Sequence, residues 1–234
     1  MNHAIIALIL ALSASPACAS DGPDFAWGAK LPVAVKTPLK LAEGKWREAA
    51  SVPTSPQWLK STRNKSFDEA YLREILGREG FAYDLLDVAM TKLKRIEECK
   101  ALYAKAVSAA GSRAPASAKG FDDSSYLLKS RIRLAIGLAR AEISREMMGD
   151  DESGYCFQAM EAAVDALRDA ALDAEKATGD SVRAERIRRF RTSLFDVWEA
   201  AEKSKDTDVI GGIDLPKAWD DSGLGNPSDK NSKP

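Results

Sequence analysis

The residue types that carry most enzymatic chemistry are scarce in this 234-residue chain. His3 is its only histidine, and its cysteines are Cys18, Cys99 and Cys156. Ser-His-Asp and Cys-His mechanisms use an imidazole as the base near neutral pH, and haem and zinc sites usually use one as a ligand. The composition therefore favours carboxylate chemistry, lysine chemistry or no catalysis, and it predicts neither a cofactor nor a metal site.

Residues 1–19 have the pattern of an export signal. An apolar run from Ala4 to Leu12 is followed by small residues that end in Ala17-Cys18-Ala19, the A-x-A pattern of signal peptidase sites. The run is shorter than the roughly 20 apolar residues that cross a bilayer. Cleavage after Ala19 would remove His3 and leave a mature chain without histidine. The sequence thus predicts a periplasmic or secreted protein.

The cysteines offer two modifications. A lipidated Cys18 is the alternative to soluble export, although the preceding Ser15-Pro16-Ala17 fits a lipoprotein signal poorly. In an oxidising compartment, Cys99 and Cys156 are more often joined in a disulfide than left as two thiols. Such a bridge requires their Cα atoms to lie within about 7 Å of each other. We therefore expect a Cys99–Cys156 disulfide, with two free thiols as the alternative.

Prolines divide residues 20–65 into short apolar pieces. Their spacing excludes a helix through the whole region, although residues 41–50 have room for a short one. Tryptophan buries a large apolar area, so we expect this region to wrap the core of the domain as an arm. The residues concerned are Pro23, Pro32, Pro38, Pro53 and Pro56, with Trp27, Trp46 and Trp58.

Helical patterns occupy residues 66–205. Ser66-Phe67-Asp68-Glu69 is a capping box in front of a short helix, 67–76. Apolar residues then recur every three or four positions in four longer segments, the second of which Asp122 or Asp123 is expected to cap. Their stripes are Leu86, Met90, Leu93, Ile96, Cys99, Tyr103 and Val107; Leu128, Ile132, Ala135, Ala139 and Ile143; Met160, Ala163, Val164, Leu167 and Ala171; and Ile187, Phe190, Leu194, Val197, Trp198 and Ala201.

Four amphipathic helices with short connections bury their stripes most simply in an antiparallel bundle. The predicted fold is therefore all-α, a four-helix-bundle-like domain behind a proline-rich arm. Residues 206–234 are rich in Gly, Pro, Asp, Asn and Ser, which predicts a loose tail. Within this tail, residues 210–219 are apolar enough to dock as an extended segment.

One carboxylate has a recognisable context. Glu152-Ser153-Gly154-Tyr155 resembles the Glu-Ser motif of lytic transglycosylases, exported α-helical enzymes that cleave peptidoglycan with one glutamic acid as acid and base. The resemblance implies that Glu152 is catalytic. The Gly-Leu-Met-Gln segment that follows in that family is replaced here by residues that continue a helix, 158–163. The alternative is an acidic turn in which Glu152 favours the positive N-terminus of the next helix.

A group of arginines is the other candidate site. At 100° per residue these arginines spread around a helix whose inner face carries Ile187, Phe190 and Leu194. The preceding helix is acidic, so ion pairs between the two helices can engage several of them. The alternative is a binding patch for an acidic partner, formed by Arg186, Arg188, Arg189 and Arg191, with Arg183 near the helix start.

The formal net charge is −1, without the basic excess of an electrostatic nucleic-acid binder. After Leu12 no apolar run has the length of a membrane span. The sequence therefore predicts binding to another protein or to a cell-envelope component, in an inhibitor, immunity or accessory role without catalysis. The alternative function is peptidoglycan cleavage by Glu152.

The export signal predicts the N-terminus of the mature protein. Because the A-x-A pattern ends at Ala19, mass spectrometry of protein recovered from the periplasm or medium should find a chain that begins at Ser20. Intact Met1 on cytosolic protein, or a lipid on Cys18, would contradict this prediction.

Overall fold

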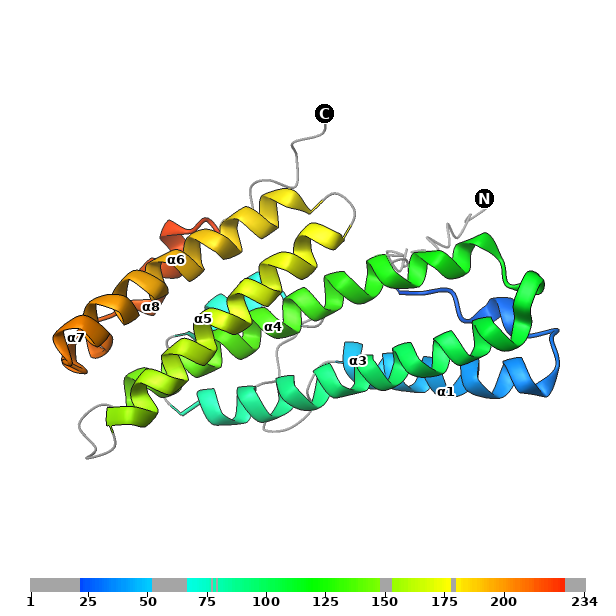
Figure 1. The fold of residues 1–234 in the computed structure, drawn as a ribbon, viewed down its shortest axis with the longest axis horizontal. Coiled ribbons are helices and arrows are strands. Elements are labelled where there is room, and N and C mark those ends of the chain that lie inside the picture. Colours follow the sequence, from blue (N-terminus) through cyan, green and yellow to red (C-terminus); the bar gives the residue numbers. More distant parts are fainter. Residues whose placement is uncertain are drawn as a thin grey trace, which may run out of the picture.

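The computed structural model describes residues 22–51, 67–76, 78, 80–147, 153–177 and 180–225. Within these residues the regular structure is helical and no strand occurs, which confirms the all-α prediction (Figure 1). No helix among them has both the length and the apolar character to span a bilayer. The helices are α1 (Val33–Ala50), α2 (Glu69–Ile75), α3 (Ala82–Ala110), α4 (Phe121–Glu146), α5 (Ser153–Lys176), α6 (Ser181–Ser204), α7 (Asp208–Gly211) and α8 (Leu215–Asp221).

The five longest helices pack in chain order, each against the next. α1 lies against α3, α3 against α4, α4 against α5, and α5 against α6. Figure 1 shows that successive partners run in opposite directions, with α1 and α3 in one half of an elongated body and α5 and α6 in the other. α4 lies between the halves. In the described chain, the four antiparallel helices expected from the sequence are thus joined by α1 as a fifth.

Helix α4 is buried around its circumference rather than along one stripe. The predicted inward residues Leu128, Ile132 and Ala135 are buried, but so are Leu134 and Leu138, which lie outside that stripe. The reason is the central position of α4, since α3, α5 and α7 all contact it.

The short helix expected at residues 41–50 is part of a longer one, because α1 begins at Val33 and, against expectation, continues through Pro38. Pro32 occupies the N-cap position. Its carbonyl accepts hydrogen bonds from the backbone N–H groups three and four positions further along the chain. Pro38 lies only one turn further on, so the helix loses the single hydrogen bond that its missing N–H would make. The buried face that includes Leu39, Ala42 and Trp46 packs against α3, and this packing outweighs the loss.

Aromatic side chains tie the N-terminal region to the helical core, as the tryptophans led us to expect. The indole Nε1 of Trp27 donates a hydrogen bond to the hydroxyl of Tyr103 at 3.1 Å. Tyr103 stacks on Phe121 with ring centroids 4.3 Å apart, and Trp46 meets the same Phe121 ring edge-on. The described part of residues 20–65 is therefore integral to the folded body, while Trp58 lies outside the described residues.

The C-terminal region is helical in part, so the prediction of a loose tail is wrong for its first twenty residues, 206–225. Residues 210–219 dock as expected, but as helices α7 and α8 rather than in an extended conformation. Trp219 is fully buried and meets Phe190 of α6 edge-on, with ring centroids 5.4 Å apart. The side chain of Asp214 caps α8 by accepting from the backbone N–H of Lys217.

Two local predictions are corrected by packing. Neither Asp122 nor Asp123 caps α4, because the N-cap position is Gly120 and both aspartates lie in the first helical turn. In α3, Ile96 is buried as predicted, whereas Met90 is 45% exposed. The short helix α2 is capped by Asp68, whose carboxylate accepts from the N–H of Tyr71, while Ser66 lies outside the described residues.

The close approach of α4 and α5 depends on Gly137. A Cβ at this position would lie 2.7 Å from Cγ of buried Leu167 and 3.3 Å from the carbonyl oxygen of Ala163. The two helices are further joined by Ser130, whose hydroxyl donates to the Ala170 carbonyl at 2.7 Å, and by Ser144, which donates to the Cys156 carbonyl at the same distance.

We predict that Gly137→Ala destabilises the protein by about 1–2 kcal/mol, because overpacking outweighs the gain in helix propensity. The matched control is Gly44→Ala in α1, where a Cβ would meet nothing within 4 Å, and which should stabilise by up to about 1 kcal/mol. Urea unfolding of the two variants tests the prediction. Equal stabilisation by both substitutions would show that α4 and α5 are not closely packed here.

Candidate functional site

The expected disulfide is absent: Cys99 and Cys156 are both free and buried. Cys99 lies midway along α3, where burial raises the pKa of its thiol to about 12. Cys156 lies in the first turn of α5 and donates from Sγ to the carbonyl of Ser144 near the end of α4. The two thiols belong to different helix contacts, and each fills the core as a small apolar group.

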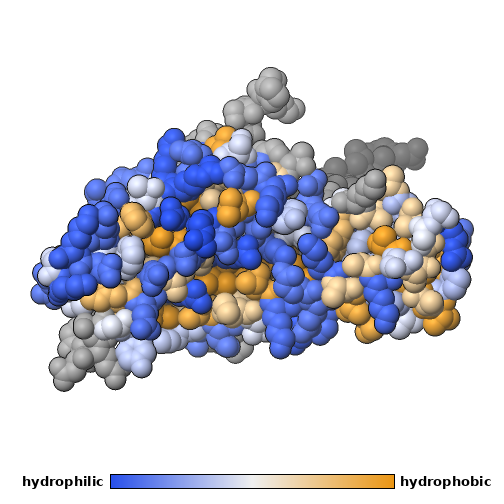
Figure 2. Space-filling view, in the orientation of Figure 1, coloured by the Kyte–Doolittle hydropathy of each residue, from blue (hydrophilic) through white to orange (hydrophobic). Residues whose placement is uncertain are grey.

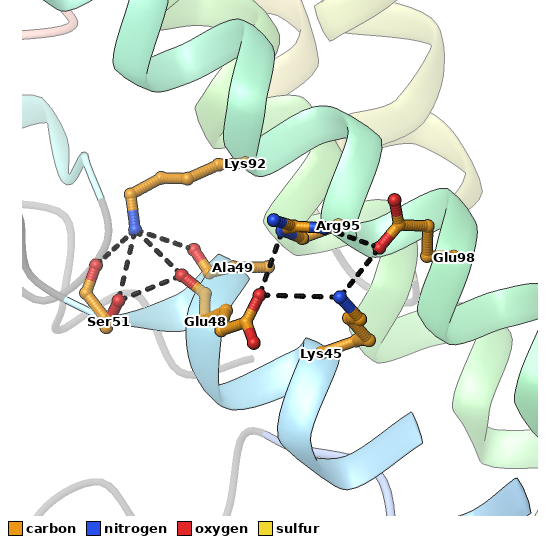
Figure 3. Close-up of polar contacts among 7 residues, drawn as sticks. All are labelled: Lys45, Glu48, Ala49, Ser51, Lys92, Arg95 and Glu98. Carbon is orange, nitrogen blue, oxygen red and sulfur yellow. Dashed lines mark hydrogen bonds and ion pairs between the residues drawn. The ribbon is translucent and has the colours of Figure 1, made fainter. Parts of the chain in front are cut away.

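Lys92 of α3 is a second reactive group that the fold buries, at 5% exposure. Its Nζ donates to three carbonyl oxygens at the C-terminal end of α1, those of Glu48 at 3.2 Å, Ala49 at 3.1 Å and Ser51 (Figure 3). Burial lowers the pKa of Lys92 to about 8, a change that is typical of catalytic lysines. Its donors are nevertheless directed at carbonyls that have no partner within the helix, so Lys92 caps α1.

Four charged side chains extend this contact toward the surface. Lys45 and Glu48 project from α1, and Arg95 and Glu98 project from α3 (Figure 3). Lys45 Nζ lies 3.0 Å from Glu98, and Arg95 lies 2.8 Å from both carboxylates. Such partly exposed pairs each contribute less than about 1 kcal/mol, so they orient α1 on α3 more than they stabilise it.

The arginines of α6 are engaged within the fold. Arg188 pairs with Glu175 of α5, as the acidity of that helix predicted, and Arg189 pairs with Glu185 at 3.3 Å. Arg191 donates to the Val164 carbonyl of α5 and lies over the ring of Phe195, while Arg186 lies against Gly223. Figure 2 shows a strongly hydrophilic surface over α6. Arg188 and Arg191 therefore join α6 to α5, whereas Arg189 pairs within α6. The binding patch stays a prediction.

Arg183, at the start of α6, contacts two other helices directly and a third through Ser130. Its guanidinium forms an ion pair with Glu69 of α2 and donates from Nη1 to the hydroxyl of Ser130 in α4, at 3.0 Å. Ser130 in turn donates to the carbonyl of Ala170 in α5. Burial alone would raise the pKa of Glu69, but the charge and hydrogen bond of Arg183 hold it below its usual value.

A surface cavity of about 520 Å³, here called the polar pocket, is formed where three distant parts of the chain meet. The turn after α2, the last turn of α4 and the connection between α7 and α8 each contribute to its walls. Its lining residues are Leu76, Arg78, Glu142, Arg145, Glu146, Gly212, Ile213, Asp214 and Pro216.

An ion pair between buried Glu142 and partly exposed Arg145 forms the base of the polar pocket. Glu142 is 3% exposed, and both of its carboxylate oxygens accept from Arg145, one from Nε at 3.0 Å and the other from Nη2. This hydrogen bonding raises the pKa of Arg145 above its usual value. Because the pair uses one edge of the guanidinium, Nη1 of Arg145 has no hydrogen-bond partner among the described residues.

The remaining charges of the polar pocket lie nearer its rim. Burial, and next the charge of Glu142, raise the pKa of Glu146, toward which the backbone N–H of Gly80 points. Asp214 is exposed and retains one carboxylate oxygen beyond the one that caps α8. Arg78 forms an ion pair with Glu74 at 2.9 Å. The pocket therefore presents charges of both signs beside apolar side chains.

The sequence alone did not indicate the polar pocket. The strongest indication of this pocket in the sequence was the spacing of Glu142, Arg145 and Glu146, three charged residues close to the end of a predicted helix. Nothing local shows that α7 and α8 fold over this turn and bury Glu142. The predicted catalytic residue Glu152 lies outside the described residues, so its role stays a prediction.

Comparison of the chain with protein-family models, with curated proteins and with solved structures finds no match. Across the described ranges, no group of three or more His, Cys, Asp or Glu side chains is arranged to hold a metal ion. The polar pocket is the candidate site because it gathers charged and apolar side chains from three segments of the chain.

We predict that Lys92 makes stability depend on pH. Its pKa is about 8 in the folded protein against 10.5 in the unfolded chain, so between these values the unfolded state binds more protons and stability rises with pH. The rise amounts to about 3 kcal/mol over the whole interval. Relative to wild type, Lys92→Met should lack this rise in urea unfolding measured between about pH 8 and 10.5.

The control for this measurement is Lys40→Met, which replaces an exposed lysine of α1. Its stability curve should run parallel to that of the wild type. Parallel curves for wild type and Lys92→Met would instead show that Lys92 keeps an ordinary pKa in the fold.

Proposed function

We propose that this chain is an exported helical protein that acts by binding a protein or another component of the cell envelope, without catalysis of its own. Proteins that act in this way include the inhibitor, immunity and accessory proteins of the envelope. The polar pocket is the observation that supports this proposal. Its volume of about 520 Å³ lies in the range of about 300–1,000 Å³ that is typical of ligand sites, which combine apolar walls with a few placed polar groups.

The placement of the reactive side chains also supports binding. The thiols of Cys99 and Cys156 are buried, and the amine of Lys92 is directed at backbone carbonyls. None of these three groups lines the polar pocket. The pocket instead holds guanidinium and carboxylate groups, which are suited to recognising a charged partner.

The periplasmic or extracellular location is part of the same proposal. It is supported by the export pattern of residues 1–19, which lie outside the described residues. The protein would meet its partner in that compartment, where peptidoglycan and envelope proteins are both accessible.

The test is binding to two envelope preparations by protein produced with its own export sequence. Co-sedimentation with purified peptidoglycan and cross-linking to envelope proteins are measured for wild type and for the double variant Arg78→Gln/Glu146→Gln. We expect the double variant to bind at least about tenfold more weakly, because a charge-assisted hydrogen bond contributes about 1.5–3 kcal/mol. The matched control is Glu161→Gln/Arg168→Gln on the outer face of α5, which should bind as wild type does.

Two outcomes would contradict the proposal. Equal binding by the wild type and the pocket variant would show that the polar pocket takes no part in the function. Release of soluble muropeptides from peptidoglycan that is lost in Glu152→Gln would instead establish the lytic enzyme.

A further inference from the structure

The charges that line the polar pocket are held apart by the fold. Arg78 follows α2, Glu146 ends α4, and Asp214 precedes α8. Glu142 pairs with Nε and Nη2 of Arg145 at the base, and Nη1 lies outside that pair. Positive and negative groups therefore reach the cavity from different segments of the chain.

Opposite charges on the walls disfavour a ligand of a single sign. A simple anion at Nη1 of Arg145 would also meet Glu146 and Asp214, whose charges already contribute to the raised pKa of Arg145. A simple cation at Glu146 would meet the guanidinium groups of Arg78 and Arg145 across the same cavity. A ligand that carries both charges can place each of them beside a group of the opposite sign, so that attraction offsets these repulsions.

We infer that the polar pocket binds an amino acid or short peptide with a free ammonium and a free carboxylate. The ammonium is placed by Glu146 and Asp214, and the carboxylate by Nη1 of Arg145 together with Arg78. An ammonium beside Glu146 offsets the burial and like charge that raise the pKa of this carboxyl. Leu76, Ile213 and Pro216 supply apolar surface for the side chains of the ligand. This assignment rests on the proposed function, since it names the ligand of the same pocket.

The first experiment measures which charges of the ligand matter. Isothermal titration calorimetry compares the dipeptide Ala-Ala with N-acetyl-Ala-Ala, which lacks the ammonium, and with Ala-Ala amide, which lacks the carboxylate. Each blocked dipeptide should bind at least about tenfold more weakly than Ala-Ala, because each loses one charge-assisted contact. Equal binding by all three dipeptides would overturn the inference.

The second experiment locates the ammonium with variants that preserve the fold. Glu146→Gln removes a charge at the exposed rim, and Asp214→Asn removes a charge while asparagine still caps α8. In the double variant, Ala-Ala and N-acetyl-Ala-Ala should bind with affinities within about twofold of each other, while the preference over Ala-Ala amide is retained. Arg145 is left intact because its removal would leave the buried carboxylate of Glu142 without a partner.

Glu161→Gln on α5 is the matched control and should discriminate among the dipeptides as wild type does. If the double variant still binds Ala-Ala much more tightly than N-acetyl-Ala-Ala, the assignment of the ammonium to Glu146 and Asp214 is overturned. Envelope binding that depends on the polar pocket, combined with no binding of Ala-Ala, would overturn the ligand class and leave the proposed function standing. Envelope binding that is insensitive to the pocket charges would overturn the proposed function itself.

Discussion

The burial of α4 on all its faces is the constraint from which the rest of the structure follows. A buried polar group on such a helix needs a partner, because an unpaired one costs about 1–3 kcal/mol, and Nε of Arg131 is the only buried side-chain polar atom of α4 that lacks one among the described residues. Ser130 and Ser144 meet this requirement by donating to carbonyls of α5, and Glu142 meets it by pairing with Arg145. The two serine bonds also fix the position of α5 on α4. The axial register of α5 on α4 is thus set at both ends of their contact, with Gly137 between them permitting the close approach.

The same principle explains why so many charged residues serve helix contacts. Lys92 satisfies the last carbonyls of α1, Arg183 joins α2 and α6 to α4, and Arg191 donates to a carbonyl of α5. A long cationic side chain can cover apolar surface with its stem and place its charged end on a distant acceptor. In this chain the groups that would be suspected of chemistry in an isolated sequence are largely used to hold helices in position.

The polar pocket results from this arrangement, and some of the charged groups that line it do not hold helices together. Its base is the last turn of α4, fixed by the central position of that helix, and its walls come from elements that dock on α4 and α6. Because both carboxylate oxygens of buried Glu142 accept from Arg145, the guanidinium is held in one orientation without a ligand. A site that is organised before binding loses less entropy when the ligand arrives, which favours recognition as the role of this pocket.

The sequence by itself determined the features that depend on local periodicity and local turn chemistry. These are the all-α class, the short helix near residues 67–76, and the inner face of α6 through Ile187, Phe190 and Leu194. A residue three or four positions away on a helix is a neighbour whatever the rest of the chain does, so such patterns can be interpreted without the fold. The pairing of α6 arginines with the acidic helix α5 was predictable for the same reason, since the two helices are consecutive.

Only the tertiary structure decided the features that depend on contacts between distant residues. α1 continues through Pro38 because its buried face packs on α3, and residues 208–221 are helical because Ile210 and Trp219 find a core to enter. Cys99 and Cys156 remain thiols because α3 and α5 place them in separate helix contacts. The polar pocket requires three segments to converge, and the burial of Glu142 arises only there. Helix propensities differ by less than about 1 kcal/mol for ordinary residues and by about 3 kcal/mol for proline, whereas burying one large apolar side chain is worth about 1.5–3 kcal/mol. The several apolar side chains that α1 buries therefore outweigh the cost of Pro38.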